Sequence, residues 1–180
     1  SSPAFALNPV IESLAVWLMK LISRGLITPD QADVVSMKVL GTPLMAVMDM
    51  IGGNPIMPVA CELLGNSFLP WMKEVPEALL ERIESGTPWR SIKELSDVPA
   101  IEPSTAEFVQ QTLEAVYLSV VGYLVEHKIV DREDLEHGIA IAFRMTPPSK
   151  LVKSIGGPVD AYSIVASASE SVPGIYIPQK

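Results

Sequence analysis

Asn8 is the polar residue whose position most suggests chemistry. It follows the short apolar stretch Phe5-Ala6-Leu7 and stands directly before Pro9, where a long apolar segment begins. An amide held at a helix start can donate a hydrogen bond to an oxygen that gains negative charge during a reaction. A structural role is equally open, because asparagine followed by proline is a favourable helix N-cap. Asn8 is therefore the one candidate substrate-binding residue, and capping is its alternative role.

The histidines and the cysteine lack the neighbours that catalysis or metal binding needs. His127 and His137 are the two histidines, and no Ser–His–Asp spacing surrounds either of them. We expect His127 at a helix C-terminus, where its charge suits the helix dipole, and His137 on the surface. Cys61 is the single cysteine, which excludes a disulfide and favours a small buried hydrophobic residue. We expect no metal site and no catalytic residue in this chain alone.

Two further sets of side chains have structural explanations. The acidic set falls where helices are expected to start, and acids favour first helical turns because of the helix dipole. The second set is rich in methionine, whose flexible side chain adapts to flexible ligands, so it could line a groove for an acyl chain. Packing in the core or in a dimer is the alternative. The acidic set is Asp30, Asp33, Glu133, Asp134 and Glu136, and the second set, of soft side chains, is Met45, Met48, Met50, Trp71 and Met72.

Helices are the elements that must position these residues. Glycines and prolines divide the apolar pattern into helical segments, and no alternating run is long enough for a sheet. Asn8-Pro9 is expected to start the first helix, and Thr28 with Gln31 to form a capping box for the second. The sequence predicts an all-α fold with helices over residues 8–24, 28–40, 42–51, 58–64, 76–85, 104–128, 131–143, 147–155 and 159–169.

The second half of the chain repeats the pattern of the first. Leu21 to Ile27 aligns with Leu124 to Val130 at an offset of 103 residues (124 − 21), and one extra residue near Met145 changes the offset to 104. A helical unit that cannot cover its own long helix gains stability from a second copy. We predict a first repeat over residues 1–90, a linker over 91–103, and a second repeat with a C-terminal tail over 104–180. At this offset Gln111 replaces Asn8.

Charge and hydropathy restrict the partners. The net charge is −8, the pI is about 4.7, and no cluster of Lys and Arg is present, so nucleic acid is not expected to bind. The apolar runs 10–22 and 116–125 are shorter than the roughly 20 residues of a membrane span, so no membrane is expected. The lone cysteine is typical of the cytoplasm. The first residue is Ser1, not Met, which suggests a processed or excised product or the remnant of a tag, and leaves room for a further segment upstream.

The order of these segments resembles the C-terminal part of the 3-hydroxyacyl-CoA dehydrogenase family. In that family an aromatic-apolar-apolar-Asn-Arg entry precedes an apolar helix, an acidic turn, and a Gly/Pro segment that ends in Asp-x-x-Gly. The second half is similar to the degenerate second unit of longer members. The matching segments are Phe5 to Asn8, Gly25 to Asp33, Gly41 to Pro43, Asp49 to Gly52, Gly65 to Pro70 and Leu79 to Gly86.

The resemblance implies a fold and a function. The fold would be two repeated helical units similar to the 6-phosphogluconate dehydrogenase C-terminal-like fold. The function would be the acyl-CoA cleft wall and homodimer interface of an enzyme of fatty-acid β-oxidation, which transfers a hydride from a 3-hydroxyacyl-CoA to NAD. An N-terminal domain would bind NAD and supply a catalytic His–Glu pair, and Asn8 would point at the reacting oxygens of the substrate.

The sequence departs from the family in three places. Pro9 stands where the family has arginine, Gln111 replaces the asparagine in the second unit, and no G-x-G-x-x-G follows a strand. This chain alone is therefore expected to bind no NAD and to be inactive. Two alternatives stay open: a stand-alone helical oligomerisation or scaffold protein without catalysis, and the C-terminal half of a dehydrogenase that acts on a smaller hydroxy acid.

Overall fold

The computed structural model describes residues 3–179, with side chains from Leu7 onward. These residues form nine α-helices and three short 3-10 helices and no strand, so the predicted all-α class is confirmed. The α-helices are α1 (Pro3–Ser23), α2 (Pro29–Leu40), α3 (Leu44–Ile51), α4 (Met57–Gly65), α5 (Glu77–Ser85), α6 (Pro103–Glu126), α7 (Arg132–Ala142), α8 (Pro148–Ser154) and α9 (Pro158–Ala168).

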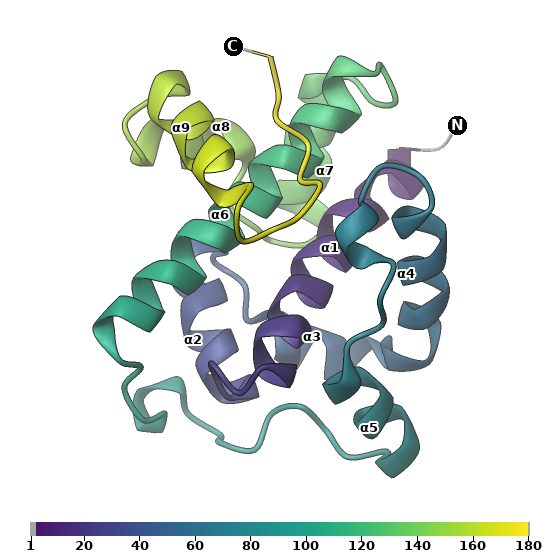
Figure 1. Ribbon diagram of the computed structural model, residues 1–180, viewed down its shortest axis with the longest axis vertical. Helices are drawn as coiled ribbons and strands as arrows, with labels where there is room; N and C mark the ends of the chain where they lie inside the picture. The colour runs from purple at the N-terminus through teal and green to yellow at the C-terminus, as the bar shows by residue number, and fades with distance from the viewer. Residues whose placement is uncertain (1–2, 180) are drawn as a thin grey trace.

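Two long helices, α1 and α6, pack against each other in the interior and organise the rest. In Figure 1, α2 to α5 lie around α1, whereas α8 and α9 lie beside α6 in the upper part of the view. Buried side chains of both halves belong to one hydrophobic core. The segment from Val10 to Leu21 is almost wholly buried, as its all-round apolar composition predicts. Trp17 donates its indole hydrogen to Thr112 at 3.0 Å and links the two helices.

The predicted start of the first helix is wrong. α1 begins at Pro3, so Asn8 does not cap it and Pro9 lies inside the helix. Proline has no amide hydrogen, so α1 lacks one backbone hydrogen bond at this turn, but burial of the residues that follow stabilises the helix on both sides of it. The side chains of Phe5 and Ala6, which belong to the entry motif, lie outside the described side chains.

Most other helix boundaries follow the predicted caps and stops. Thr28 accepts from the amide of Gln31 while the Gln31 side chain accepts from the amide of Thr28, which completes the capping box. The first five predicted helices end at a glycine or just beside one, and Gly41, Gly52 and Gly86 adopt the left-handed conformation that favours glycine. These local signals are therefore reliable here.

The same hydrogen bonds recur at corresponding turns of the two halves. The turn after α1 and the turn after α6 each contain two backbone hydrogen bonds that close the helix end, one between residues three apart and one between residues five apart. They run from Gly25 N to Ile22 O and Leu26 N to Leu21 O in the first half, and from Lys128 N to Val125 O and Ile129 N to Leu124 O in the second. Each atom in the second half lies 103 residues after its counterpart, and Lys128 even keeps the positive φ of Gly25.

A second correspondence involves a carboxylate that accepts a hydrogen bond from the start of the next helix. Asp33 on α2 accepts from the amide of Met45 at 2.6 Å, and Glu136 on α7 accepts from the amide of Ser149 at 2.8 Å. Glu136 lies 103 residues after Asp33, and Ser149 lies 104 residues after Met45. The two halves thus dock their third helix by an equivalent bond.

Asp30 lies in the first turn of α2, as predicted, whereas Asp33 lies three residues further along the helix. Both side chains are buried beneath other segments of the chain, and each accepts hydrogen bonds from backbone amides of the segment that covers it. Asp30 accepts from the amides of Ser91 and Ile92, and Asp49 on α3 accepts from those of Trp89 and Arg90. Burial raises the pKa of Asp30, but the bonds from Ser91 and Ile92 outweigh it and hold that pKa below its usual value. Two carboxylates therefore fix four consecutive amides that lead into the predicted linker.

By length and composition alone, α6 is the one described helix that could cross a membrane. Of its most apolar 18-residue window, 61% is buried inside the protein. The pair α2 and α3 would qualify only as a single span bent by 108°. Core helices of soluble proteins meet the same criterion, so it is weak evidence for a span.

Candidate functional site

A groove of about 660 Å³ lies beside Asn8 and is the candidate site of the first half. Three parts of the chain form it: the N-terminal half of α1, the α3–α4 region, and the loop after α7. Most of its surface is apolar, and Asn8, Glu12 and Thr42 are its polar side chains on the first half. A concave apolar surface with a few polar groups is the usual form of a small-molecule site.

Asn8 lies on the wall of this groove with its side chain exposed. α1 extends about one and a half turns before Asn8, so the Asn8 side-chain amide does not cap the helix. The structure shows no hydrogen bond from this amide to another described residue. Glu12 follows one helical turn later on the same wall and is half-buried. Burial raises the pKa of Glu12 above its ordinary value. An amide donor and a half-buried carboxyl with a raised pKa therefore lie one helical turn apart on the same wall.

The predicted set of soft side chains is divided between three places. Met48 and Met50 line the groove, with Met50 exposed to 78% of its surface. Met45 and Met72 are fully buried in the core, as the packing alternative predicted. Trp71 lines a separate depression with Lys20 and Arg24 and stacks edge-on against Trp17. Only part of the set can therefore contact a ligand beside Asn8.

The second half contributes Phe143 and Arg144, which the sequence did not indicate. The Thr42 hydroxyl lies 3.0 Å from the carbonyl oxygen of Phe143 and 3.2 Å from that of Arg144, and Thr146 donates its amide to Leu40. These bonds hold the loop after α7 over the end of α2. Arg144 is the one cation among the described residues that line the groove. Because it stands more than 130 positions after Asn8, no local pattern could have placed it there.

The remaining candidates take structural positions. His127 caps α6 and stacks on Tyr123, with ring centroids 3.9 Å apart, as expected for a helix C-terminus. His137 is exposed on α7. Cys61 is fully buried, and burial raises the pKa of its thiol to about 11, so it behaves as a small hydrophobic residue. Among residues 3–179, no three His, Cys, Asp or Glu side chains gather as a metal site would require.

The groups that line the groove are of kinds that suit ligand recognition. The Asn8 amide can donate to a carbonyl or hydroxyl oxygen, and the methionine surface can receive a flexible aliphatic chain. The Arg144 guanidinium can pair with an anionic group at the rim. Comparison of the chain with protein-family models, with curated proteins and with solved structures finds no match.

Proposed function

We propose that this chain is the substrate-binding part of a 3-hydroxyacyl-CoA dehydrogenase. In this role the groove receives the acyl-CoA, and a separate NAD-binding domain supplies the cofactor and the catalytic residues. The observation that carries the proposal is the position of Asn8. Its amide is exposed, has no hydrogen bond to a described residue, and stands in an apolar groove of about 660 Å³.

The groove matches the chemistry of an acyl thioester. The reacting oxygens of the substrate are hydrogen-bond acceptors, which suit the Asn8 amide, and the acyl chain suits the apolar wall formed by Met48, Met50 and Ile51. Arg144 stands where an anionic part of the ligand would leave the groove. Pro9, where the family has arginine, lies within α1 and does not withdraw Asn8 from the groove.

The matching bonds of the two halves support a duplicated plan for this chain. A duplicated unit with the 6-phosphogluconate dehydrogenase C-terminal-like fold would explain why Asp33–Met45 and Glu136–Ser149 recur at the predicted offsets. Under this plan Gln111 occupies the slot of Asn8 on α6. Gln111 is exposed but bonds to Glu107 one turn earlier, so the amide that is free in the first unit is engaged in the second.

A titration of the isotope-labelled chain with hexanoyl-CoA tests the groove directly by NMR. Asn8→Ala is expected to weaken binding by about 3- to 10-fold, the value of one ordinary hydrogen bond, without lowering the melting temperature. Met50→Gln puts an uncharged polar side chain of similar length at an exposed position of the same groove and is expected to weaken binding as well. Gln111→Ala removes an amide from the corresponding slot and serves as the matched control, with unchanged affinity.

Turnover in the enzyme that contains the NAD-binding domain provides the second measurement. Loss of a donor aimed at a developing oxyanion lowers kcat by about 10²- to 10³-fold, so Asn8→Ala should act on kcat much more than on stability. Normal turnover by Asn8→Ala would exclude its role at the reacting oxygens. Equal binding of hexanoyl-CoA by the wild type and by Met50→Gln would exclude the groove as the acyl site.

A second candidate function is oligomerisation through the α3–α4 face, which would also supply the homodimer of the first proposal. Five large apolar side chains with more than half of their surface exposed are concentrated there. They are Met50, Ile51, Ile56, Val59 and Leu63. Large apolar surfaces of this kind are commonly covered in an assembly. Light scattering should report a dimer that Val59→Asp with Leu63→Asp converts to monomer; a wild-type monomer at high concentration would contradict it.

A further inference from the structure

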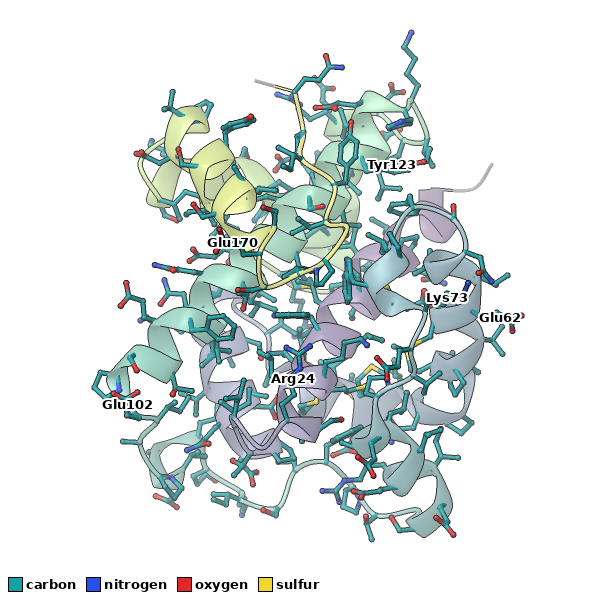
Figure 2. The ribbon with its side chains drawn as sticks, in the orientation of Figure 1. Arg24, Glu62, Lys73, Glu102, Tyr123 and Glu170 are labelled. Atoms are coloured by element: carbon teal, nitrogen blue, oxygen red, sulfur yellow. The ribbon has the colours of Figure 1, made fainter. Side chains whose placement is uncertain are left out.

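Four buried methionines of the first helical unit correspond to much smaller residues in the second. The offsets of 103 and 104 residues are anchored by the hydrogen bonds at the two turns and at the two carboxylates described above. Met19, Met45, Met48 and Met57 are each at most 2% exposed, and their counterparts are Gly122, Ser149, Val152 and Ala161. Sulfur atoms accordingly gather around α1 and α4 in Figure 2.

Part of the volume that these side chains would occupy is open in the second unit, although Pro178 fills the space directly beside Gly122. A pocket of about 370 Å³ lies between α6, α7, α8 and α9, and all four smaller residues line it. The rest of its wall is mainly aliphatic, including Leu118, Val125, Leu135 and Val165. Protein interiors are normally close-packed, and an apolar cavity of roughly 150 Å³ already admits benzene. The second unit therefore has room for a whole molecule where the first has its own side chains.

The C-terminal segment covers one side of this pocket without filling it. Pro178 packs on Gly122 so closely that a Cβ atom at Gly122 would overlap its ring. Glu126 holds the segment, because it accepts from the Tyr176 hydroxyl and, at 2.8 Å, from the Gln179 amide. Tyr176 also packs edge-on against Tyr123, which Figure 2 shows beside the segment. A ligand in the pocket would be enclosed by four helices and this segment.

The charges at the rim select against an anionic ligand. Glu126 and Glu136 line the pocket with Arg132, which leaves two carboxylates against one guanidinium in a chain of net charge −8. Both carboxylates already accept hydrogen bonds from the protein. A charged head would have to be desolvated beside a net negative rim, whereas an uncharged body would lose little.

We propose that the second helical unit binds one uncharged apolar molecule in the pocket between α6, α7, α8 and α9, beneath the C-terminal segment. The site is separate from the groove beside Asn8, so it stands whether or not this chain binds acyl-CoA. The methionines of the first unit indicate where the ligand would lie. It would fill the space beside Ser149, Val152 and Ala161, and Pro178 would close the pocket at Gly122.

Methyl NMR of the full chain with 1-octanol as the probe tests this pocket. Saturable shifts are expected at Leu118, Val152 and Val165, and octanoate, which has the same chain with an anionic head, should bind at least tenfold more weakly. Ala161→Met places the side chain of the first unit in the pocket and should lower octanol affinity more than tenfold. Because it fills a void, it should also raise the melting temperature, by about 2–4 °C for each kcal/mol gained.

Val159→Met is the matched control, since it introduces the same side chain on α9 at a position 78% exposed. It should leave octanol binding unchanged. Val152→Met serves as the second filling variant if Ala161→Met does not fold. Octanol binding that survives both filling variants would place the site elsewhere and overturn the proposal. Absence of octanol binding to the wild type, with a filling variant more stable, would show an empty void and would overturn it equally.

Discussion

The indole nitrogen of Trp17 lies 3.0 Å from the hydroxyl oxygen of Thr112, and this bond joins two buried helices across 95 residues of sequence. Thr112 in turn donates to the carbonyl oxygen of Phe108 within α6. Both side chains are almost fully buried, so neither can replace this partner with water. The two halves of the chain thus meet through a satisfied polar pair inside an apolar contact.

Removal of the Thr112 hydroxyl should therefore lower the free energy of unfolding by more than the net contribution of one hydrogen bond. Thr112→Val has nearly the same shape but leaves the Trp17 N–H buried without an acceptor, and we expect a loss of about 1–3 kcal/mol in the free energy of unfolding. Thr112→Ser keeps the hydroxyl and should lose clearly less. Urea denaturation of the three proteins measures both values. Equal stability of wild type and Thr112→Val would show that the indole has another acceptor.

Asn8→Ala and Pro9→Ala distinguish a helix that begins at Pro3 from one that begins at Pro9. With Asn8 inside α1, its replacement by alanine should change stability by less than about 0.5 kcal/mol. Pro9→Ala should raise stability by about 1–3 kcal/mol, because it restores an amide donor within the helix. An N-cap at Asn8 predicts the opposite pair of results: a loss of about 1 kcal/mol for Asn8→Ala and no gain for Pro9→Ala. Thermal denaturation of the two variants decides between them.

Asp33 should make the protein less stable as the pH rises from mildly acidic to neutral. Burial raises the pKa of Asp33 to about 6, against the lowering effect of the amides of Met45 and Ala46. Because the unfolded value is lower, the folded protein binds more protons between pH ~4 and pH ~6. Its contribution is fully present below pH ~4, is lost as the pH rises through ~6, and amounts to about 3 kcal/mol.

Urea denaturation between pH 4 and pH 8 measures this effect. Asp33→Asn keeps an acceptor oxygen but cannot ionise, so its stability should vary less over this range than that of the wild type. Glu12 and Glu114 also have raised pKa values because of burial and act in the same direction, so part of the slope should remain. A variant with the full wild-type slope would assign the pH dependence to those two groups.

The segment 89–92, whose four amides are bound by Asp49 and Asp30, should open in two separate parts. Asp49→Ala removes the acceptor of the Trp89 and Arg90 amides, and Asp30→Ala removes that of Ser91 and Ile92. We expect hydrogen exchange of the released pair to accelerate by about tenfold or more, since local opening then needs no broken bond. Amide exchange measured by NMR resolves the pairs. Acceleration of all four amides in both variants would show that the segment opens as one unit.

The helix boundaries could be predicted because their causes are local. Thr28 and Gln31 cap α2 through bonds that span three residues, and Gly41, Gly52 and Gly86 end their helices because each adopts a positive φ. The predicted start of the first helix is wrong for the opposite reason, because non-local packing decides it. Asn8-Pro9 is a good local start, but burial of the helix that follows outweighs the hydrogen bond that Pro9 cannot make.

The burial of the acids and the composition of the groove required the tertiary structure. The local pattern places Asp30 and Asp33 near the start of a helix, and only the docking of residues 91–92 and of α3 buries them. Asn8 could be chosen from the sequence, whereas Glu12 and Arg144 could not. No local motif marks Glu12, and Arg144 reaches the groove from the other half of the chain.

The amino-acid sequence by itself determined the all-α class and most helix ends, because these depend on short-range caps, stops and periodicity. The tertiary structure alone decided that the Asn8 side chain is exposed on a groove and that Gly122, Ser149, Val152 and Ala161 line a pocket. The physical reason is that hydrogen-bond satisfaction and packing volume depend on groups distant in sequence. Gly122 and Pro178, 56 residues apart (178 − 122), are in contact only because the C-terminal segment folds back over α6.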